Sequence, residues 1–530
     1  MMRAHIDSVT CRGKRFFGWG WALAARPLVR ATLHIHYAPA AGGAEVDRFV
    51  CTLGLQRPDI ANAFPDTAHA ANAGMIFFGM IRPGREIRQA VLHAELSDGS
   101  HQQLSLPDFF NDGRRAGIGP APRRGGLGMR LRWWLTAAPR WLKRRFAAPP
   151  TAAPKAPTLA LPQTPAFLVF DHDMGGGANR YRQEMVQKQL AAGRPVVLAH
   201  PRIGDLSYGL RVLDGGGERH ASIATQQELL ALLAALPLAE IAVNSLIGFE
   251  EPGEMLEWAR AARARSGARL FFPLHDFHAV CPSWTLLDQD GSYCGIPDTG
   301  RCATCLPRNP AMFNDIVSGR TIIDWRQDWL AFLAACDEIH VFSESSRTLL
   351  ARAYPTLAPD TVKLLPHDVS WLRPQKITFA RAARLTIGVI GTIGLHKGAE
   401  IVNRIAAIIA AEQLDIGLVV IGTLESAVIP ANITITGPYD SGELAALLLR
   451  HQVNACLLPS IWPETFSYVT QEIMNLGMPL AVFDLGAPAE RVRHYALGRV
   501  IPEIDARAAL DGLRALHAAA NGKPETGAPS

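Results

Sequence analysis

The sequence predicts an α/β protein in which two doubly wound domains follow a small all-β sandwich domain. Short stretches of period-two alternation fill the first 110 residues and predict strands. From residue 164, buried strand-like runs alternate with helical patterns, which is typical of a parallel sheet covered by helices. A second series of the same kind begins near residue 376. A chain of 530 residues has room for three or four domains at about 150 residues each.

The first 110 residues predict the β-sandwich domain. Alternating segments cover residues 16–23, 31–37, 91–96 and 103–106. The turn signal Ser97-Asp98-Gly99 separates the last two, and residues 57–59 (Arg-Pro-Asp) fit a connection between strands. Strands of this length and spacing are typical of two packed antiparallel sheets.

Residues 111–163 predict a linker with an unusual charge. Its stretch 113–146 holds ten of the 53 basic residues and no acidic one, which leaves 43 basic against 48 acidic residues elsewhere. Trp133, Trp134 and Trp141 lie among these arginines, and Pro139 interrupts any helix. Interleaved tryptophan and arginine favour peripheral contact with an anionic membrane. A solvated linker is the next interpretation, and nucleic-acid binding is disfavoured because no other part of the chain resembles a nucleic-acid module.

The N-terminus has no apolar core of a secretion signal, and no run of about 18 apolar residues predicts a membrane span. We therefore expect a cytoplasmic protein, peripheral at the inner membrane face. A reducing compartment disfavours structural disulfides among its eight cysteines.

Residues 164–375 predict the first α/β domain. A buried strand at 166–170 leads into a loop that contains Gly175, Gly176 and Gly177, and a helix is expected from about Tyr181. Glycines in such a loop let a ligand approach the backbone, although the motif is neither a dinucleotide fingerprint nor a P-loop. His275 follows the strand at 269–274, at the edge of an open sheet where ligands bind. For His275 a sugar contact and an ordinary loop position are equally favoured, and His278 is the weaker candidate.

A cysteine-rich insertion at 275–310 contains four thiols, Cys281, Cys294, Cys302 and Cys305. Four cysteines within one turn-rich loop match a closed, structural zinc site, which would supply folding energy to the loop. Two disulfides and four free thiols are the alternatives.

Residues 376–520 predict the second α/β domain, and 521–530 a tail. A strand at 385–390 leads into a glycine-bounded loop with Gly391 and Lys397, and a helix is expected at 399–411. A lysine at this place can neutralise a diphosphate, whereas the alternative is a solvated lysine at a helix start.

Two glutamates lie between the strand-like runs 455–458 and 480–483. Glu464 sits in the Pro-Glu-Thr-Phe turn, and Glu472 is expected about two turns into a short helix that ends at Gly477. The amides of Thr465, Phe466 and Ser467 offer a phosphate cradle at the helix start. The alternative is a surface helix with two solvated glutamates.

These residues resemble retaining glycosyltransferases of the GT-B fold, of the kind that builds bacterial polysaccharides and O-antigen. The spacing of Glu464 and Glu472 looks like the family's E-x7-E signature, and Lys397-Gly398 looks like its phosphate-contacting pair. The similarity covers roughly residues 166–520, and residues 1–110 resemble a β-sandwich appended to some members. A departure is Thr392, near the place where the family often has a second cation.

The resemblance implies two Rossmann-like domains and the transfer of a hexosyl or related sugar from a nucleotide-diphosphate donor. It implies a donor-sugar contact for Glu464 and His275, a ribose contact for Glu472, and a glycan or lipid-linked acceptor. It also implies retention of anomeric configuration and no catalytic metal. Two rivals are a catalytically weak glycan-binding or scaffold protein with a degenerate fold, and a nucleotide-sugar isomerase.

Overall fold

The computed structural model describes residues 2–13, 15–39, 46–67, 69–82, 85–106, 159–309, 320–372, 375–379, 384–426 and 429–522. The chain forms two compact units: Met1–Val341 with Leu349–Lys363, and Phe342–Thr348 with Leu364–Ser530. The basic stretch 113–146 lies outside the described residues, so its membrane contact stays a prediction. Within the described ranges, no helix is both long and apolar enough to cross a membrane.

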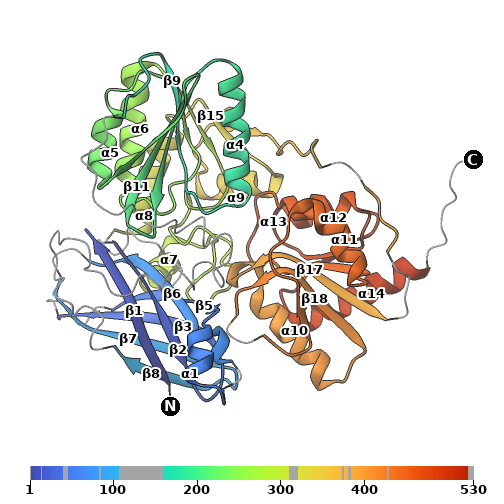
Figure 1. The fold of residues 1–530 in the computed structure, drawn as a ribbon. Helices are drawn as coiled ribbons and strands as arrows, with labels where there is room; N and C mark the ends of the chain where they lie inside the picture. Colours follow the sequence, from blue (N-terminus) through green and yellow to red (C-terminus); the bar gives the residue numbers. More distant parts are fainter. Residues whose placement is uncertain are drawn as a thin grey trace, which may run out of the picture. The chain divides into compact units, whose positions relative to one another are not determined.

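The N-terminal region of the first unit is all-β (Figure 1). Two antiparallel sheets have the orders β1-β2-β6-β5 and β4-β3-β7-β8. Their core includes Phe16 and Phe49, one from each sheet, whose ring centroids lie 4.8 Å apart. The connection at Arg57 is not a simple turn, because Pro58 begins a short helix. The elements are β1 (Arg3–Arg12), β2 (Arg15–Leu23), β3 (Leu28–Tyr37), β4 (Val46–Val50), β5 (Thr52–Leu55), α1 (Pro58–Ala63), η1 (Ala70–Asn72), β6 (Gly74–Met80), β7 (Ile87–Leu96) and β8 (His101–Ser105).

The α/β part of the first unit has the strand order β12-β11-β10-β9-β13-β14-β15-β16. Its strands are β9 (Ala166–Phe170), β10 (Val196–Arg202), β11 (Ser207–Asp214), β12 (Gly217–Ile223), β13 (Leu238–Val243), β14 (Arg269–Pro273), β15 (Glu338–Val341) and β16 (Val362–Leu364). The run from β10 to β15 is parallel, whereas β11 and β12 form an antiparallel hairpin on the β10 edge that the sequence did not predict.

Helices cover both faces of this sheet, with α4 on one side and α5 and α6 on the other (Figure 1). Helix α4 begins at Gly176, earlier than expected, and Val186 packs on the sheet beside Phe167 and Val169. The helical elements are α4 (Gly176–Ala191), α5 (Gln226–Leu233), α6 (Pro252–Ser266), α7 (Thr299–Cys305), η2 (Leu306–Arg308), α8 (Ile322–Leu333), α9 (Glu344–Ala353) and η4 (Pro359–Thr361).

The second unit is built on a parallel sheet with the order β19-β18-β17-β20-β21-β22. Its two faces carry separate cores: residues of α10 and α14 pack on one, and residues of α11, α12 and α13 on the other. The doubly wound fold is thereby confirmed. The elements are β17 (Leu385–Ile393), η5 (Leu395–Lys397), α10 (Ala399–Ala411), β18 (Ile416–Leu424), β19 (Ile433–Ile435), η6 (Ser441–Glu443), α11 (Leu444–Arg450), β20 (Ala455–Leu458), α12 (Tyr468–Asn475), β21 (Leu480–Phe483), α13 (Gly486–Val492), β22 (Gly498–Ile501) and α14 (Ala506–Gly522).

Candidate functional site

The strand order of the second unit places a switch point between β17 and β20. Successive strands run outward from β17 to β18 and β19, and then from β20 to β21 and β22 on its other side. Ligands of open α/β sheets bind at such a point, beyond the carboxyl ends of the strands. Lys397 follows β17 and Glu464 follows β20, and these two strands are parallel neighbours. The topology therefore brings together the two residues on which the sequence prediction rests.

The loop that carries Lys397 packs tightly on the turn that carries Glu464. Gly398 has a φ of +80°, and a Cβ there would lie 2.0 Å from the carbonyl oxygen of Pro459. The amide of Ile461 donates to the carbonyl of His396 at 3.1 Å. Glycine is thus required at 398 by both conformation and space. Gly391 also has a positive φ, but a Cβ there would meet no neighbour within 4 Å.

Glu464 is a buried carboxylate, with 8% of its surface exposed. The Ser460 hydroxyl donates to it, and Lys397 supplies the charge that lowers its pKa most. Burial by itself raises the pKa of Glu464. The Lys397 charge and hydrogen bonds with Ser460 and Ser467 outweigh that effect, so the pKa lies below its ordinary value. Glu464 is therefore held ionised and in place at the edge of the sheet.

Helix α12 begins at Tyr468, just after the turn that contains Thr465 and Phe466. Its N-cap residue is Ser467, whose φ of +67° is unusual for a residue with a side chain. Strain of this kind persists where surrounding structure holds it, often at a binding site. Glu472 lies only a little over one turn into α12, so the expected depth of two turns was wrong. It is half-buried, and its charge, after burial, helps to raise the pKa of Tyr439.

Arg491 is a cation at this site that the sequence did not predict. It lies on α13, and its guanidinium is 4.5 Å from the Phe466 ring centroid. It donates to the carbonyl oxygens of Phe466 and Ser467, the latter at 2.7 Å. Burial lowers the pKa of Arg491 to about 10, and Glu464 is the main charge that opposes this shift. Arg491 belongs to a different helix from both glutamates, and no motif in the sequence points to it.

The first unit has its own switch point between β9 and β13. The buried Asp171 at the end of β9 accepts from Asn179 at 2.9 Å and from Arg182 at 3.0 Å. Asn179 also accepts from the amide of Gly175 at 2.6 Å, which ties the glycine loop to the first turn of α4. Gly176 and Gly177 are exposed at the start of this helix. The loop is therefore a rigid helix entry whose glycines leave its surface open.

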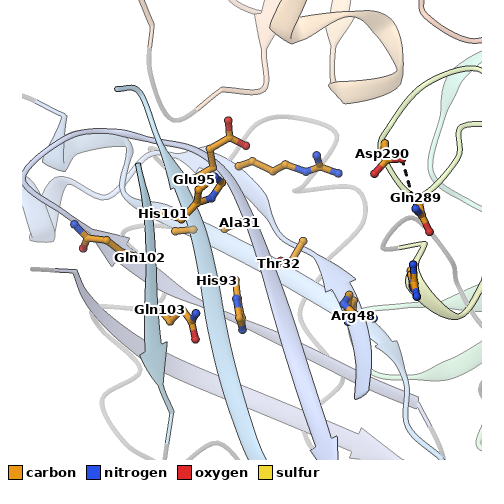
Figure 2. Close-up of a pocket in the computed structure, with 13 residues that line it drawn as sticks. Ala31, Thr32, Arg48, His93, Glu95, His101, Gln102, Gln103, Gln289 and Asp290 are labelled. Atoms are coloured by element: carbon orange, nitrogen blue, oxygen red, sulfur yellow. Dashed lines mark hydrogen bonds between the residues drawn. The ribbon is translucent and has the colours of Figure 1, made fainter. Parts of the chain in front are cut away.

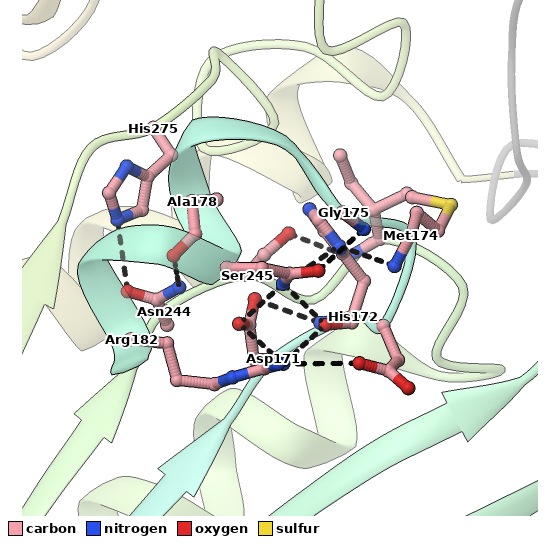
Figure 3. Close-up of polar contacts among 12 residues, drawn as sticks. Asp171, His172, Met174, Gly175, Ala178, Arg182, Asn244, Ser245 and His275 are labelled. Atoms are coloured by element: carbon pink, nitrogen blue, oxygen red, sulfur yellow. Dashed lines mark hydrogen bonds and ion pairs between the residues drawn. The ribbon is translucent and has the colours of Figure 1, made fainter. Parts of the chain in front are cut away.

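His275 lies at the same carboxyl edge and is half-buried. Its Nε2 lies 2.9 Å from Asn244 Oδ1, and Asn244 donates in turn to the Ala178 carbonyl at 3.2 Å (Figure 3). The structure therefore places His275 beside the N-terminal turn of α4, with Gly176 and Gly177. His278, by contrast, is a core residue, and burial lowers its pKa to about 3.

Asp276 is buried next to this edge and has an unusual acidity. Burial raises the pKa of its carboxyl to about 7, and the charge of Asp171 adds to the rise. Hydrogen bonds from the His278 amide and the Ser245 hydroxyl act in the opposite direction. A carboxyl of this kind changes its charge near neutral pH.

The arrangement of the four cysteines of the insertion does not support the predicted zinc site, which stays a prediction. Cys281 lies 3.5 Å from the Ser283 hydroxyl, Cys305 is 3.7 Å from Asn309 Nδ2, and Cys302 is 4.0 Å from an Arg326 nitrogen. Among the described residues, the thiols do not occur in a group whose ligand atoms lie close enough to hold an ion. All four are free, and burial raises the pKa of each. The thiols also influence one another, because the charges of Cys294 and Cys302 add to the raised pKa of Cys281.

Comparison with known proteins found solved structures that are similar over 66–67% of the chain and a family model that matches residues 375–521. Sucrose-phosphate synthase from Thermosynechococcus elongatus is 15% identical, with a TM-score of 0.46 over 67% of this chain and 90% of that one. Anabaena Alr3699/HepE in complex with UDP and glucose is 13% identical, with a TM-score of 0.41 over 66% and 89%. The lipopolysaccharide outer core galactosyltransferase WaaB is 10% identical, with a TM-score of 0.39 over 67% and 91%. No curated protein matches the chain significantly. Residues 375–521, which include Lys397, Glu464, Glu472 and Arg491, match the family model of glycosyl transferases group 1.

Proposed function

We propose that the protein is a glycosyltransferase that uses a nucleotide-diphosphate sugar as donor. The observation that carries the proposal is the buried Glu464 carboxylate, whose pKa the charge of Lys397 lowers, at the switch point of the second α/β domain. That domain is the segment that matches the family of glycosyl transferases group 1. A buried carboxylate beside a lysine suits a ligand that offers sugar hydroxyls on one side and phosphate charge on the other.

The proposed roles follow from the chemistry of each side chain. Lys397 and the N-terminus of α12 bind the diphosphate, and Glu472 accepts hydrogen bonds from the ribose hydroxyls. Glu464 accepts from the hydroxyls of the donor sugar. Arg491 holds the carbonyls of Phe466 and Ser467 and so orients the turn that precedes the helix. It takes the place of the second cation that Thr392 does not supply.

In the reaction, the bond between the anomeric carbon and the diphosphate oxygen breaks, and its electron pair stays on the diphosphate. An acceptor hydroxyl oxygen forms the new bond to the anomeric carbon, and its proton passes to the departing diphosphate. Lys397 lowers the barrier because it stabilises the charge that develops on the leaving group. Retention at the anomeric carbon, without a catalytic metal, is part of the proposal through the resemblance of Glu464 and Glu472 to the family signature.

The acceptor side is proposed for the first unit, and for His275 of this unit the resemblance implies a donor-sugar contact. The acceptor is a glycan or a lipid-linked glycan, used in the synthesis of cell-surface polysaccharide. Residues 113–146 would then hold the enzyme against an anionic membrane. Flotation with anionic liposomes tests this part, and equal binding by a variant that lacks residues 113–146 would contradict it.

The test of the main proposal is a panel of UDP-, GDP-, ADP- and dTDP-sugars, assayed for transfer and for slow hydrolysis. With the sugar that reacts, Glu464→Ala and Lys397→Ala should each lower turnover by about tenfold or more, because each removes a charge that acts on the transition state. Circular dichroism must show that both variants fold. NMR of the product then gives the anomeric configuration. Donor binding without transfer or hydrolysis would instead identify a binding or scaffold protein, and unchanged turnover in both variants would refute the assigned roles.

A further inference from the structure

Three histidines lie on one face of the N-terminal sheet β4-β3-β7-β8, far along the sequence from the residues of the proposed transferase site. His34 and His36 are two residues apart on β3, so their side chains point to the same side of the strand. His93 of β7 pairs with Thr32 and therefore lies on that side too. Leu33 and Ile35, which point the other way, are 1% and 0% exposed and form the core. The three imidazoles thus share the outer face of the sheet.

The three side chains converge. One ligand nitrogen from each ring can be chosen so that all lie within 4.8 Å of one another. The rings of His34 and His93 stack with centroids 3.7 Å apart and planes 20° apart, and the centroid of His36 is 6.5 Å from that of His34. A zinc ion would need each nitrogen at about 2.0–2.1 Å. Rotation about the soft terminal torsion of histidine allows the remaining approach, because all three rings are only half-buried.

The ring nitrogens are available for a ligand. Toward other described residues, neither His36 nor His93 makes a side-chain hydrogen bond, and His34 has one, between Nε2 and the Thr32 hydroxyl at 3.1 Å. A ligating histidine normally uses its second nitrogen for such a contact, which orients the ring. A metal ion binds the neutral form of imidazole, which has a free lone pair.

The surroundings of the cluster leave room for a further ligand. A hollow of about 360 Å³ lies over the three histidines and is also lined by Gln89, Gln103 and Ser105, among others. A second hollow, of about 540 Å³, extends from His93 and Arg48 to Gln289 and Asp290 of the cysteine-rich insertion (Figure 2). Three protein ligands with open space above them are typical of sites that keep a position for water or another small ligand.

We propose that His34, His36 and His93 form a binding site for a divalent transition-metal ion, with Zn²⁺ as the ion of choice. Imidazole is a preferred ligand of Zn²⁺, Ni²⁺ and Cu²⁺, and a poor one for Mg²⁺ and Ca²⁺. Arg48 places a positive charge on this face, because it lies opposite His34 in the pairing of β3 with β4. Its guanidinium donates to the Pro307 carbonyl at 3.4 Å. Its guanidinium weakens cation binding and favours an anionic fourth ligand on the metal. The site does not depend on the transferase proposal.

The test is Zn²⁺ titration of the full chain by calorimetry, with protein that carries no polyhistidine tag and has been stripped with EDTA. One equivalent of Zn²⁺ should bind, and Co²⁺ in its place should give the visible absorption of a low-coordinate site. Each of His34→Gln, His36→Gln and His93→Gln should weaken binding by more than about tenfold, since loss of an outer partner of a ligand alone costs about 10–100-fold. Arg48→Gln should tighten binding several-fold.

Two controls distinguish the three histidines from a neighbouring histidine on the same face and from the cysteine-rich insertion. His101→Gln removes an exposed histidine of β8, whose pairing with Glu95 places it on the same face, and should leave the affinity unchanged. A Cys302→Ser, Cys305→Ser double variant should also leave it unchanged. Melting temperatures in EDTA identify any variant that misfolds, in which case the Arg48→Gln result decides. Binding that survives His93→Gln, that disappears with the cysteines, or that is not stoichiometric would overturn the proposal.

Discussion

The substitution Lys397→Met tests whether the loop after β17 binds a diphosphate. Methionine keeps most of the length and the apolar character of the lysine stem and removes the charged ammonium group with its hydrogen-bond donors. Lys397 is half-buried, and its charge lowers the pKa of Glu464. A half-buried side chain has less conformational freedom to lose on binding than an exposed one, so most of the strength of the contact should appear in the affinity.

The magnitude follows from the type of contact that is lost. A hydrogen bond to a charged group contributes about 1.5–3 kcal/mol. At about 1.4 kcal/mol per tenfold, the dissociation constant for a nucleoside diphosphate should rise by about 10- to 150-fold. The corresponding nucleoside monophosphate lacks the second phosphate, so its affinity should change by no more than about threefold. Methionine also removes the charge that offsets burial at Glu464, so the pKa of Glu464 should rise.

Calorimetric titration with UDP, GDP and ADP identifies the base, and the matching monophosphate is then compared with the diphosphate. Lys376→Met is the matched control, because Lys376 is an exposed lysine of the same unit. Equal losses for the monophosphate and the diphosphate would show that Lys397 only maintains the loop. A loss below about threefold for the diphosphate would refute the assigned role.

Three further substitutions test the structure around the two sheet edges. The pKa of Glu464 is lowered in the folded protein, so the ionised carboxylate stabilises the fold above the ordinary carboxyl pKa of about 4.3. This stabilisation is lost as the pH falls through the lower folded pKa. The difference in melting temperature between wild type and Glu464→Gln should therefore shrink in that acid range and not above pH 6. Gly398→Ala should destabilise the second unit by about 1–3 kcal/mol in chemical denaturation, because φ is +80° and the new Cβ would lie 2.0 Å from the Pro459 oxygen, whereas Gly442→Ala, with no neighbour within 4 Å, should change little. Asp276 has a raised pKa of about 7, so its contribution to the free energy of unfolding is fully present below about pH 3.9 and is lost as the pH rises to 7. Relative to Asp276→Asn, the free energy of unfolding of the wild type should fall by up to about 4 kcal/mol across this window. A difference between the two proteins that does not change with pH would contradict the burial argument.

The doubly wound fold could be predicted because its signals are local. Buried strands such as β9 (Ala166–Phe170) and β21 (Leu480–Phe483) are continuous apolar runs, and α10 (Ala399–Ala411) has a regular apolar face, so their positions matched the prediction. The hairpin of β11 and β12 was missed because β12 is largely polar and gives no continuous apolar run. The start of α4 was misplaced because three glycines disfavour a helix, whereas the Asn179 side chain holds that turn through the Gly175 amide.

In the candidate site, too, some residues could be identified from local sequence signals and others could not. Lys397, Glu464 and Glu472 each lie in a short stretch whose glycines, prolines and spacing carry the signal, and no distant residue is needed to recognise them. For the cysteines, the spacing predicts a zinc site, but among the described residues the thiols do not occur in a group whose ligand atoms lie close enough to hold an ion. Their separate partners, Ser283, Asn309 and Arg326, come from within the loop and from α8, and only the folded chain reveals them.

The sequence alone determined the class of fold and the segments that carry a lysine and two glutamates as candidate site residues. Each of these depends on residues close together in the chain, through apolar periodicity, turn chemistry and helix boundaries. Only the tertiary structure decided which charges meet: Arg491 reaches the turn before α12 from another helix, and His93 meets His34 and His36 across two paired strands. Such contacts depend on strand order and register, because side chains far apart in the chain become neighbours only when the sheet is assembled.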